Sequence, residues 1–282
     1  MTPQEYCRHK TKESHSSFLF AFIFLSQKKR NALTALYAFC REVDDVVDGQ
    51  NEYKIGKNKL DWWRTEIERL YDKKPQHPVT RALELYISEY NLDKAYFIEI
   101  IDGMEMDLDF DRYENFKQLQ LYCYRVASTV GVLSAQIFGY QDSKTLKYAH
   151  NLGIALQLTN IIRDIGEDAQ RGRIYIPLDV LTKFNISETE ILNNTKSRKI
   201  KDLVENQTQH AQYFYKLAMD NLPNIDRNNQ KPGLMMGNIY YMLLSKIVKV
   251  SPENFLKQKI KLSNFRKFLI VLLTFFNYNW IR

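Results

Sequence analysis

The chain has 282 residues, of which 45% are hydrophobic, 26% are charged and only 17 are Gly or Pro (10 and 7). This composition excludes a disordered, collagen-like or low-complexity chain and favours a helical protein with a sizeable core. The net charge of +7 predicts an anionic partner, such as a nucleic acid, an acidic lipid head group or a phosphorylated small molecule, without choosing among them.

Neither disulfide bonds nor a zinc site are expected, because Cys7, Cys40 and Cys123 lie far apart and form no CxxC pair. The first residues resemble a capped helix start, not a signal peptide. Two apolar runs, 18–25 and 268–276, are well short of the ~20 residues that span a bilayer. We therefore expect a cytoplasmic protein.

Apolar residues recur at helical spacing and no segment alternates as a strand would, which predicts an all-α protein with a single domain over residues 1–282. The breaks fall at segments that contain Pro or Gly. In chain order the predicted helices cover residues 3–12, 16–25, 28–49, 55–73, 79–90, 92–110, 115–138, 142–169, 187–221, 231–249 and 261–277.

The predicted helix 28–49 carries an acidic stripe. Tyr37, Arg41, Asp44, Asp45 and Asp48 fall on one helical face, bordered by aliphatic residues. A solvated face usually mixes Lys with Glu, and Asp is a poor helix former, so three aspartates here favour a functional role.

A second stripe lies on the predicted helix 142–169. Asn160, Asp164 and Asp168 are spaced at i, i+4 and i+8, with Gln157 and Glu167 beside them. Two such stripes on facing helices predict a divalent-cation site, and magnesium fits because it takes a few carboxylates, keeps waters and binds phosphate oxygens.

Several arginines lie near the two stripes and could bind those phosphates bidentately: Arg41, Arg163, Arg171 and Arg173. The alternative, a buried salt-bridge network without metal, leaves carboxylates in excess of local cations. The acidic segment 102–109 is interpreted as structural, because its carboxylates spread around the helix.

Competing chemistries lack their fingerprints, since the chain has no GxGxxG, P-loop, HExxH or GxSxG sequence. The basic residues Lys28, Lys29 and Arg30 are not accompanied by a nucleic-acid recognition pattern, so no nucleic-acid partner is expected.

The segments 44–48 and 160–168 resemble the paired aspartate-rich motifs of the squalene and phytoene synthase family. Four further segments resemble blocks of that family in its order and spacing: 15–18, 37–41, 122–131 and 171–177. The resemblance covers roughly residues 5–250. It implies a single-domain isoprenoid synthase-type helical bundle around a central cavity, and head-to-head condensation of two prenyl diphosphates.

The resemblance also implies roles for individual residues. Two or three Mg²⁺ ions would be held by Asp44, Asp45, Asp48, Asn160, Asp164 and Asp168, with Asp44, Asp48, Asp164 and Asp168 essential to catalysis. The diphosphates would contact Ser17, Arg41, Asn160, Arg163, Arg173 and Tyr240. The carbocation would be steered and deprotonated by Tyr37 and Tyr124.

Three residues depart from the usual family pattern, namely His15, Arg125 and Ser128, and they resemble the bacterial presqualene diphosphate synthases of the hopanoid pathway. We therefore expect two farnesyl diphosphates to give presqualene diphosphate, without NADPH. The alternatives are a phytoene or dehydrosqualene synthase, a full NADPH-dependent squalene synthase, and a non-catalytic prenyl-lipid-binding subunit. Substrate chain length and oligomeric state stay open.

The basic, aromatic C-terminal stretch 257–282 could lie against acidic lipids, because prenyl products are very apolar. This predicts peripheral contact with the inner face of the membrane.

Overall fold

The computed structural model describes residues 1–13, 21–48, 53–195, 198–250 and 260–281. Ser17 and His15, the first half of the predicted helix 16–25 (residues 16–20) and the side chain of Asp48 lie outside the described residues.

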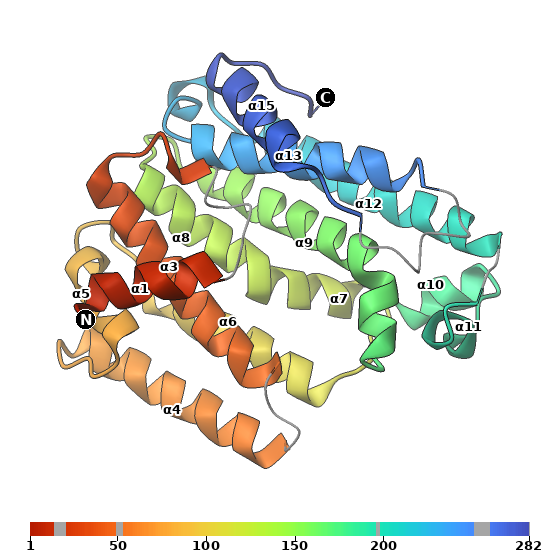
Figure 1. Cartoon of the computed structure of the whole chain (residues 1–282), viewed down its shortest axis with the longest axis horizontal. Coiled ribbons are helices and arrows are strands. Elements are labelled where there is room, and N and C mark those ends of the chain that lie inside the picture. The colour runs from red at the N-terminus through yellow and green to blue at the C-terminus, as the bar shows by residue number, and fades with distance from the viewer. Residues whose placement is uncertain (14–20, 49–52, 196–197, 251–259, 282) are drawn as a thin grey trace.

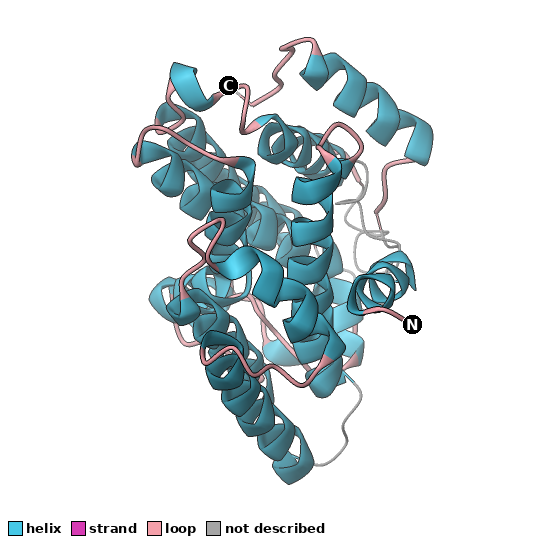
Figure 2. Ribbon diagram, turned by 90° about the vertical axis from the view of Figure 1, so that its left-hand side faces the viewer, coloured by secondary structure: helices cyan, strands magenta, loops and turns pink. Residues whose placement is uncertain are grey.

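The described elements are helical, and the all-α, single-domain prediction is confirmed (Figures 1 and 2). In chain order they are α1 (Pro3–Glu13), α3 (Gln27–Asp48), α4 (Tyr53–Tyr71), α5 (Pro78–Ile87), α6 (Lys94–Asp109), α7 (Phe116–Cys123), η1 (Tyr124–Ser128), α8 (Thr129–Phe138), α9 (Lys144–Gln170), α10 (Leu178–Lys183), α11 (Glu188–Leu192), α12 (Lys199–Asp220), η2 (Asn224–Asp226), α13 (Lys231–Ile247) and α15 (Asn264–Phe275). Within the described part of the chain, β-structure is limited to a one-residue bridge between Arg112 and Ile174.

The predicted helix 187–221 is divided in two, which corrects the sequence prediction. The short helix α11 starts at Ser187 with a capping box and ends before Asn194, whose φ of 50° is left-handed. The long helix α12 then begins at Lys199. The short helix α10, which follows Pro177, was not predicted.

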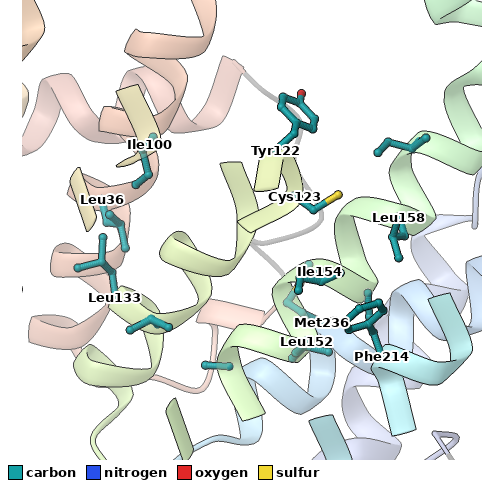
Figure 3. Close-up of a cluster of buried hydrophobic side chains, with 14 of the residues drawn as sticks. Leu36, Ile100, Tyr122, Cys123, Leu133, Leu152, Ile154, Leu158, Phe214 and Met236 are labelled. Carbon is teal, nitrogen blue, oxygen red and sulfur yellow. The ribbon is translucent and has the colours of Figure 1, made fainter. Parts of the chain in front are cut away.

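The 27-residue helix α9 runs through the middle of the fold (Figure 1). It contacts α7, η1, α8, α11, α12 and α13, so it is apolar around most of its circumference. Figure 3 shows part of this core, with Leu152 and Leu158 of α9 near Phe214 of α12 and Met236 of α13.

Two glycines allow η1 and α8 to approach α9 closely. A Cβ on Gly153 would lie 2.6 Å from the Cα of Ser128, and a Cβ on Gly131 would lie 2.7 Å from the carbonyl oxygen of Ala149. Because neither glycine has a side chain, the backbones of η1 and α8 can pack directly against the backbone of α9.

Gly153→Ala is expected to lower stability by about 1–3 kcal/mol, because a backbone must move to admit the methyl group. Gly237→Ala is the matched control, since its Cβ would meet only flexible side-chain ends at 3.0 and 3.1 Å. Thermal unfolding compares the two, and an equal or higher Tm for Gly153→Ala would contradict this packing argument.

Candidate active site

Two adjoining cavities lie at the centre of the helical bundle. The polar cavity is lined mainly by charged and tyrosine side chains, and the apolar cavity by aliphatic and aromatic ones. Residues of α3, α9 and the π-helical segment η1 line both: Tyr37, Cys40, Val126, Gln157 and Asn160. The charged cavity and the apolar cavity therefore meet at these five residues.

Both acidic stripes of the sequence reach the polar cavity, one from α3 and the other from α9. Its carboxylates are Asp44, Asp107, Asp164, Glu167 and Asp168. Its guanidinium groups are Arg41, Arg163, Arg171 and Arg173. Cations and carboxylates of this number on one cavity can bind a phosphate ester together with a metal ion.

Two arginines of the polar cavity, Arg41 and Arg163, are paired with acidic residues of their own helices. Arg41 forms ion pairs with Asp44 and, over 2.6 Å, with Asp45. Arg163 donates from Nε to Asp164 Oδ1 over 2.7 Å. These ion pairs position the guanidinium groups at the cavity wall. When an anion enters, the guanidinium groups can bind it in place of the aspartates.

Asp168 lies deeper in the polar cavity than an ordinary surface carboxylate. Burial, and then the nearby charge of Asp164, raise the pKa of Asp168 to about 7. The raised pKa of Asp168 thus reflects the excess of carboxylates around it, and a bound divalent cation would offset their negative charge.

Asn160 offers a further oxygen at the junction of the two cavities. Its Nδ2 donates to Gln157 Oε1 over 3.3 Å, whereas its buried Oδ1 has no hydrogen-bond partner among the described residues. An unpaired buried oxygen is costly to retain, so this atom is well suited to a ligand. Tyr240, from α13, lies beside Arg163 and lines the apolar cavity.

Asp45, in contrast, does not belong to the polar cavity. Besides Arg41, its carboxylate pairs with Lys10 over 2.8 Å, and it lines a separate surface groove with Trp62. The geometry therefore gives no support to Asp45 as a metal ligand.

The predicted role of Tyr124 also lacks support from its position. Tyr124 packs against His150, with ring centroids 5.7 Å apart, and is not among the described residues that line either cavity. Tyr122 lines the polar cavity instead. Tyr37, which was predicted to steer and deprotonate the carbocation, lines both cavities at their junction.

Asp107 was missed by sequence reasoning. The hydroxyl groups of Tyr122 and Tyr175 donate to its two carboxylate oxygens over 2.9 and 2.7 Å, and Arg173 donates to its backbone carbonyl over 3.1 Å. Burial raises the pKa of Asp107 to about 6. The rest of its acidic segment is structural, as predicted, because Asp102 and Glu105 pair with Arg64.

The signal for Asp107 in the sequence is weak. It sits between Met106 and Leu108, whereas its partners Tyr122 and Tyr175 lie 15 and 68 residues away.

The two described residues on which the presqualene prediction rested lie away from both cavities. Arg125 pairs with Glu99 over 3.0 Å, and Ser128 donates to the carbonyl oxygen of His150 over 2.8 Å. Neither is among the described residues that line the cavities. They therefore cannot distinguish one product from another by contact.

The donor set suits magnesium better than a metal that needs a preformed protein cage. Among the described residues, no group of three or more His, Cys, Asp or Glu side chains is placed to hold an ion alone. Magnesium typically takes one or two carboxylates and completes its shell with water and substrate phosphates, and Asp44, Asp164, Asp168 and Asn160 can supply such ligands.

Comparison with known proteins gives a consistent result. The sequence model described as "Squalene/phytoene synthase" matches residues 11–266. The chain is 36% identical to the phytoene synthase of Arthrospira platensis over 256 residues, which are 86% of this chain and 83% of that protein. It also matches longer plant relatives, of which it spans as little as 61%.

Two solved structures share the fold. A dehydrosqualene synthase with bound ligand superimposes with a TM-score of 0.85 and 29% identity, covering 98% of this chain and 97% of that one. The squalene synthase HpnC from Alicyclobacillus acidocaldarius superimposes with a TM-score of 0.78 and 26% identity, covering 87% of this chain and 92% of that one.

Proposed function

The chain belongs to the squalene/phytoene synthase family, and we propose that it condenses two molecules of geranylgeranyl diphosphate head to head to give phytoene. The observation that carries this proposal is the charged cavity that adjoins an apolar cavity and shares five lining residues with it. The names of the sequence relatives favour phytoene over the presqualene diphosphate that the sequence predicted. The similarity to a dehydrosqualene synthase structure makes farnesyl diphosphate the second candidate substrate.

The diphosphate would bind in the polar cavity, through Arg41, Arg163, Arg171 and Arg173, with Tyr240 beside Arg163. Two or three Mg²⁺ ions would be held by Asp44, Asp164, Asp168 and Asn160, with Asp48 at the end of α3. When bound, Mg²⁺ supplies Lewis-acid stabilisation of the departing diphosphate. The prenyl chains would extend into the apolar cavity, where the lining side chains exclude water.

The tyrosines of the site can guide the cation that ionisation leaves behind. Tyr37 and Tyr122 present electron-rich rings at the polar cavity, which stabilise a positive charge without reacting with it. The Tyr122 hydroxyl, already bonded to Asp107, can accept a proton from the cation while passing its own proton to the Asp107 carboxylate. A carboxylate with a pKa near 6 is well matched to this task.

The number of diphosphates released tests the proposal. Formation of phytoene releases one diphosphate for every substrate molecule consumed, whereas formation of presqualene diphosphate releases one for every two. We expect the first ratio with geranylgeranyl diphosphate and Mg²⁺, unchanged by NADPH because the reaction uses no reductant. A ratio of one to two would instead mean that the reaction stops at a cyclopropyl diphosphate intermediate, which is presqualene diphosphate when the substrate is farnesyl diphosphate.

We also propose that the C-terminal helix α15 contacts anionic lipid. Its aromatic residues Phe265 and Phe268 are 75% and 49% exposed, and Phe276 after it is 70% exposed. Phe275 stacks on Phe24 at 4.7 Å, which extends the apolar surface toward the N-terminal region. Residues 260–281 include three basic residues and no acidic one. Among the described residues, no helix has the length and apolar character needed to cross a bilayer.

Phe265→Asp is expected to lower binding to vesicles that contain phosphatidylglycerol by about tenfold. The substitution removes apolar area that the membrane would bury, and its negative charge is repelled by the anionic lipid. Tyr213→Asp is the control, since Tyr213 is exposed on α12. Vesicle sedimentation at low and high salt measures both variants. Equal losses, or none, would remove the lipid contact from the proposal.

A further inference from the structure

The two ends of the apolar cavity can be identified, because α9 and α13 both line it along their length. On α9 the lining residues run from Asn160, at the junction with the polar cavity, back to Tyr148. These positions are twelve residues apart, or about 18 Å of helix. On α13 and its N-cap residue they run from Tyr240, beside Arg163, back to Gln230, which is ten residues or about 15 Å. Tyr148 and Gln230 therefore lie at the end farthest from the charged groups.

A close contact between the two helices fixes the ring of Tyr148 at that end. The side chain is 1% exposed. A Cβ on Gly233 of α13 would lie 2.9 Å from the Tyr148 hydroxyl, so only glycine leaves room for it. One turn further toward the junction, Leu152 meets Gly237 in the same way, with a Cβ at 3.1 Å from its Cδ1. The ring cannot retreat toward α13 when a ligand presses on it.

The polar atoms at this end are not compatible with hydrocarbon. The Tyr148 hydroxyl and the Gln230 Oε1 are both buried without a hydrogen-bond partner among the described residues, although the Gln230 Nε2 donates to the carbonyls of Ala135 and Gly139. A prenyl tail that reached this end would meet both polar atoms without satisfying either, whereas it makes apolar contacts along the rest of the cavity.

From these observations we propose that Tyr148, held against Gly233, limits the length of the prenyl chain that the apolar cavity accepts. Each isoprene unit lengthens the main chain by four carbons, on the order of one 5.4 Å helical turn, so the ~18 Å from Asn160 to Tyr148 corresponds to three to four units, the C15 to C20 range, whereas a C25 chain of about 27 Å would be too long. This inference rests on the proposed function, because it specifies the substrate of the same site.

The test is the affinity for unreactive thiolodiphosphate analogues with C15, C20 and C25 chains, measured by calorimetry with Mg²⁺. Wild type is expected to bind the C25 analogue at least about tenfold more weakly than the C20 analogue. In Tyr148→Ala the two affinities are expected to agree within about threefold, because the ring and its hydroxyl no longer close the cavity.

Two further variants make the test specific. Leu156→Ala enlarges the same cavity from its wall, nearer the junction, and is expected to keep the wild-type discrimination. Gly233→Ala adds a methyl group against the Tyr148 hydroxyl, which pushes the ring into the cavity and is expected to weaken C20 relative to C15. Gly233→Ala also tests the proposed length limit if Tyr148→Ala fails to fold. In the double variant Gly233→Ala/Tyr148→Phe, the hydroxyl that meets the added methyl group is absent, so C20 binding is expected to be restored.

The inference is overturned if Tyr148→Ala keeps the discrimination against C25, if Leu156→Ala loses it equally, or if Gly233→Ala leaves the C20 to C15 ratio unchanged. In these cases the wild type still binds the C20 analogue, so the proposed function stands. If wild type binds none of the three analogues, the proposed function and the inference fail together.

Discussion

Asp164→Asn is expected to reduce turnover by about a thousandfold or more while leaving the helical fold in place. The substitution keeps the shape of the side chain and removes the charge, so it weakens any bound cation and its effect on the leaving diphosphate, which is worth several kcal/mol. The carboxylate of Asp164 is 19% exposed at the cavity wall and contributes little to the core.

The measurement is steady-state turnover with Mg²⁺, alongside circular dichroism and Tm. Asp220→Asn is the matched control, because Asp220 is exposed at the end of α12 and is not among the described residues that line either cavity. Retained activity in Asp164→Asn, with both variants folded, would remove Asp164 from the metal site.

Tyr122→Phe is expected to lower kcat by about 10²–10⁴-fold, because the ring stays and only the hydroxyl that links the cavity to Asp107 is lost. The sequence had singled out Tyr124, so Tyr124→Phe is both the control and the competing hypothesis. It is expected to behave like wild type, since Tyr124 packs on His150 away from the cavities.

Single-turnover kinetics with both variants separates chemistry from product release. A loss of activity in Tyr124→Phe together with a normal rate in Tyr122→Phe would reverse the assignment. A normal rate in both would place the proton acceptor elsewhere, with the released diphosphate as the remaining candidate.

The long helices could be predicted from the sequence because their periodic pattern is strong. The predicted helix 142–169 is α9 (Lys144–Gln170), with ends that differ by one or two residues. The break within 187–221 was not predicted, because it depends on Asn194 adopting a left-handed conformation after a five-residue helix. The backbone conformation of one residue in such a turn cannot be predicted from the spacing of apolar residues.

The two aspartate stripes could be predicted because each is contained in one helix, where spacing defines a face. Asp107 could not, since its role depends on Tyr122 and Tyr175 meeting it from distant segments. Tyr122 and Tyr124 illustrate the same limit: they lie about 200° apart around a helix, so only one can face the cavity, and the sequence does not say which. Arg125 and Ser128, on which the presqualene diphosphate prediction rested, lie outside the cavities.

The central claim is that the charged and apolar cavities act together on two prenyl diphosphates. The most direct measurement is mass spectrometry of the products formed from an equal mixture of farnesyl and geranylgeranyl diphosphate with Mg²⁺. The account predicts phytoene as the main product, with or without NADPH. Absence of any condensed product from either substrate, with folded protein and Mg²⁺ present, would contradict it.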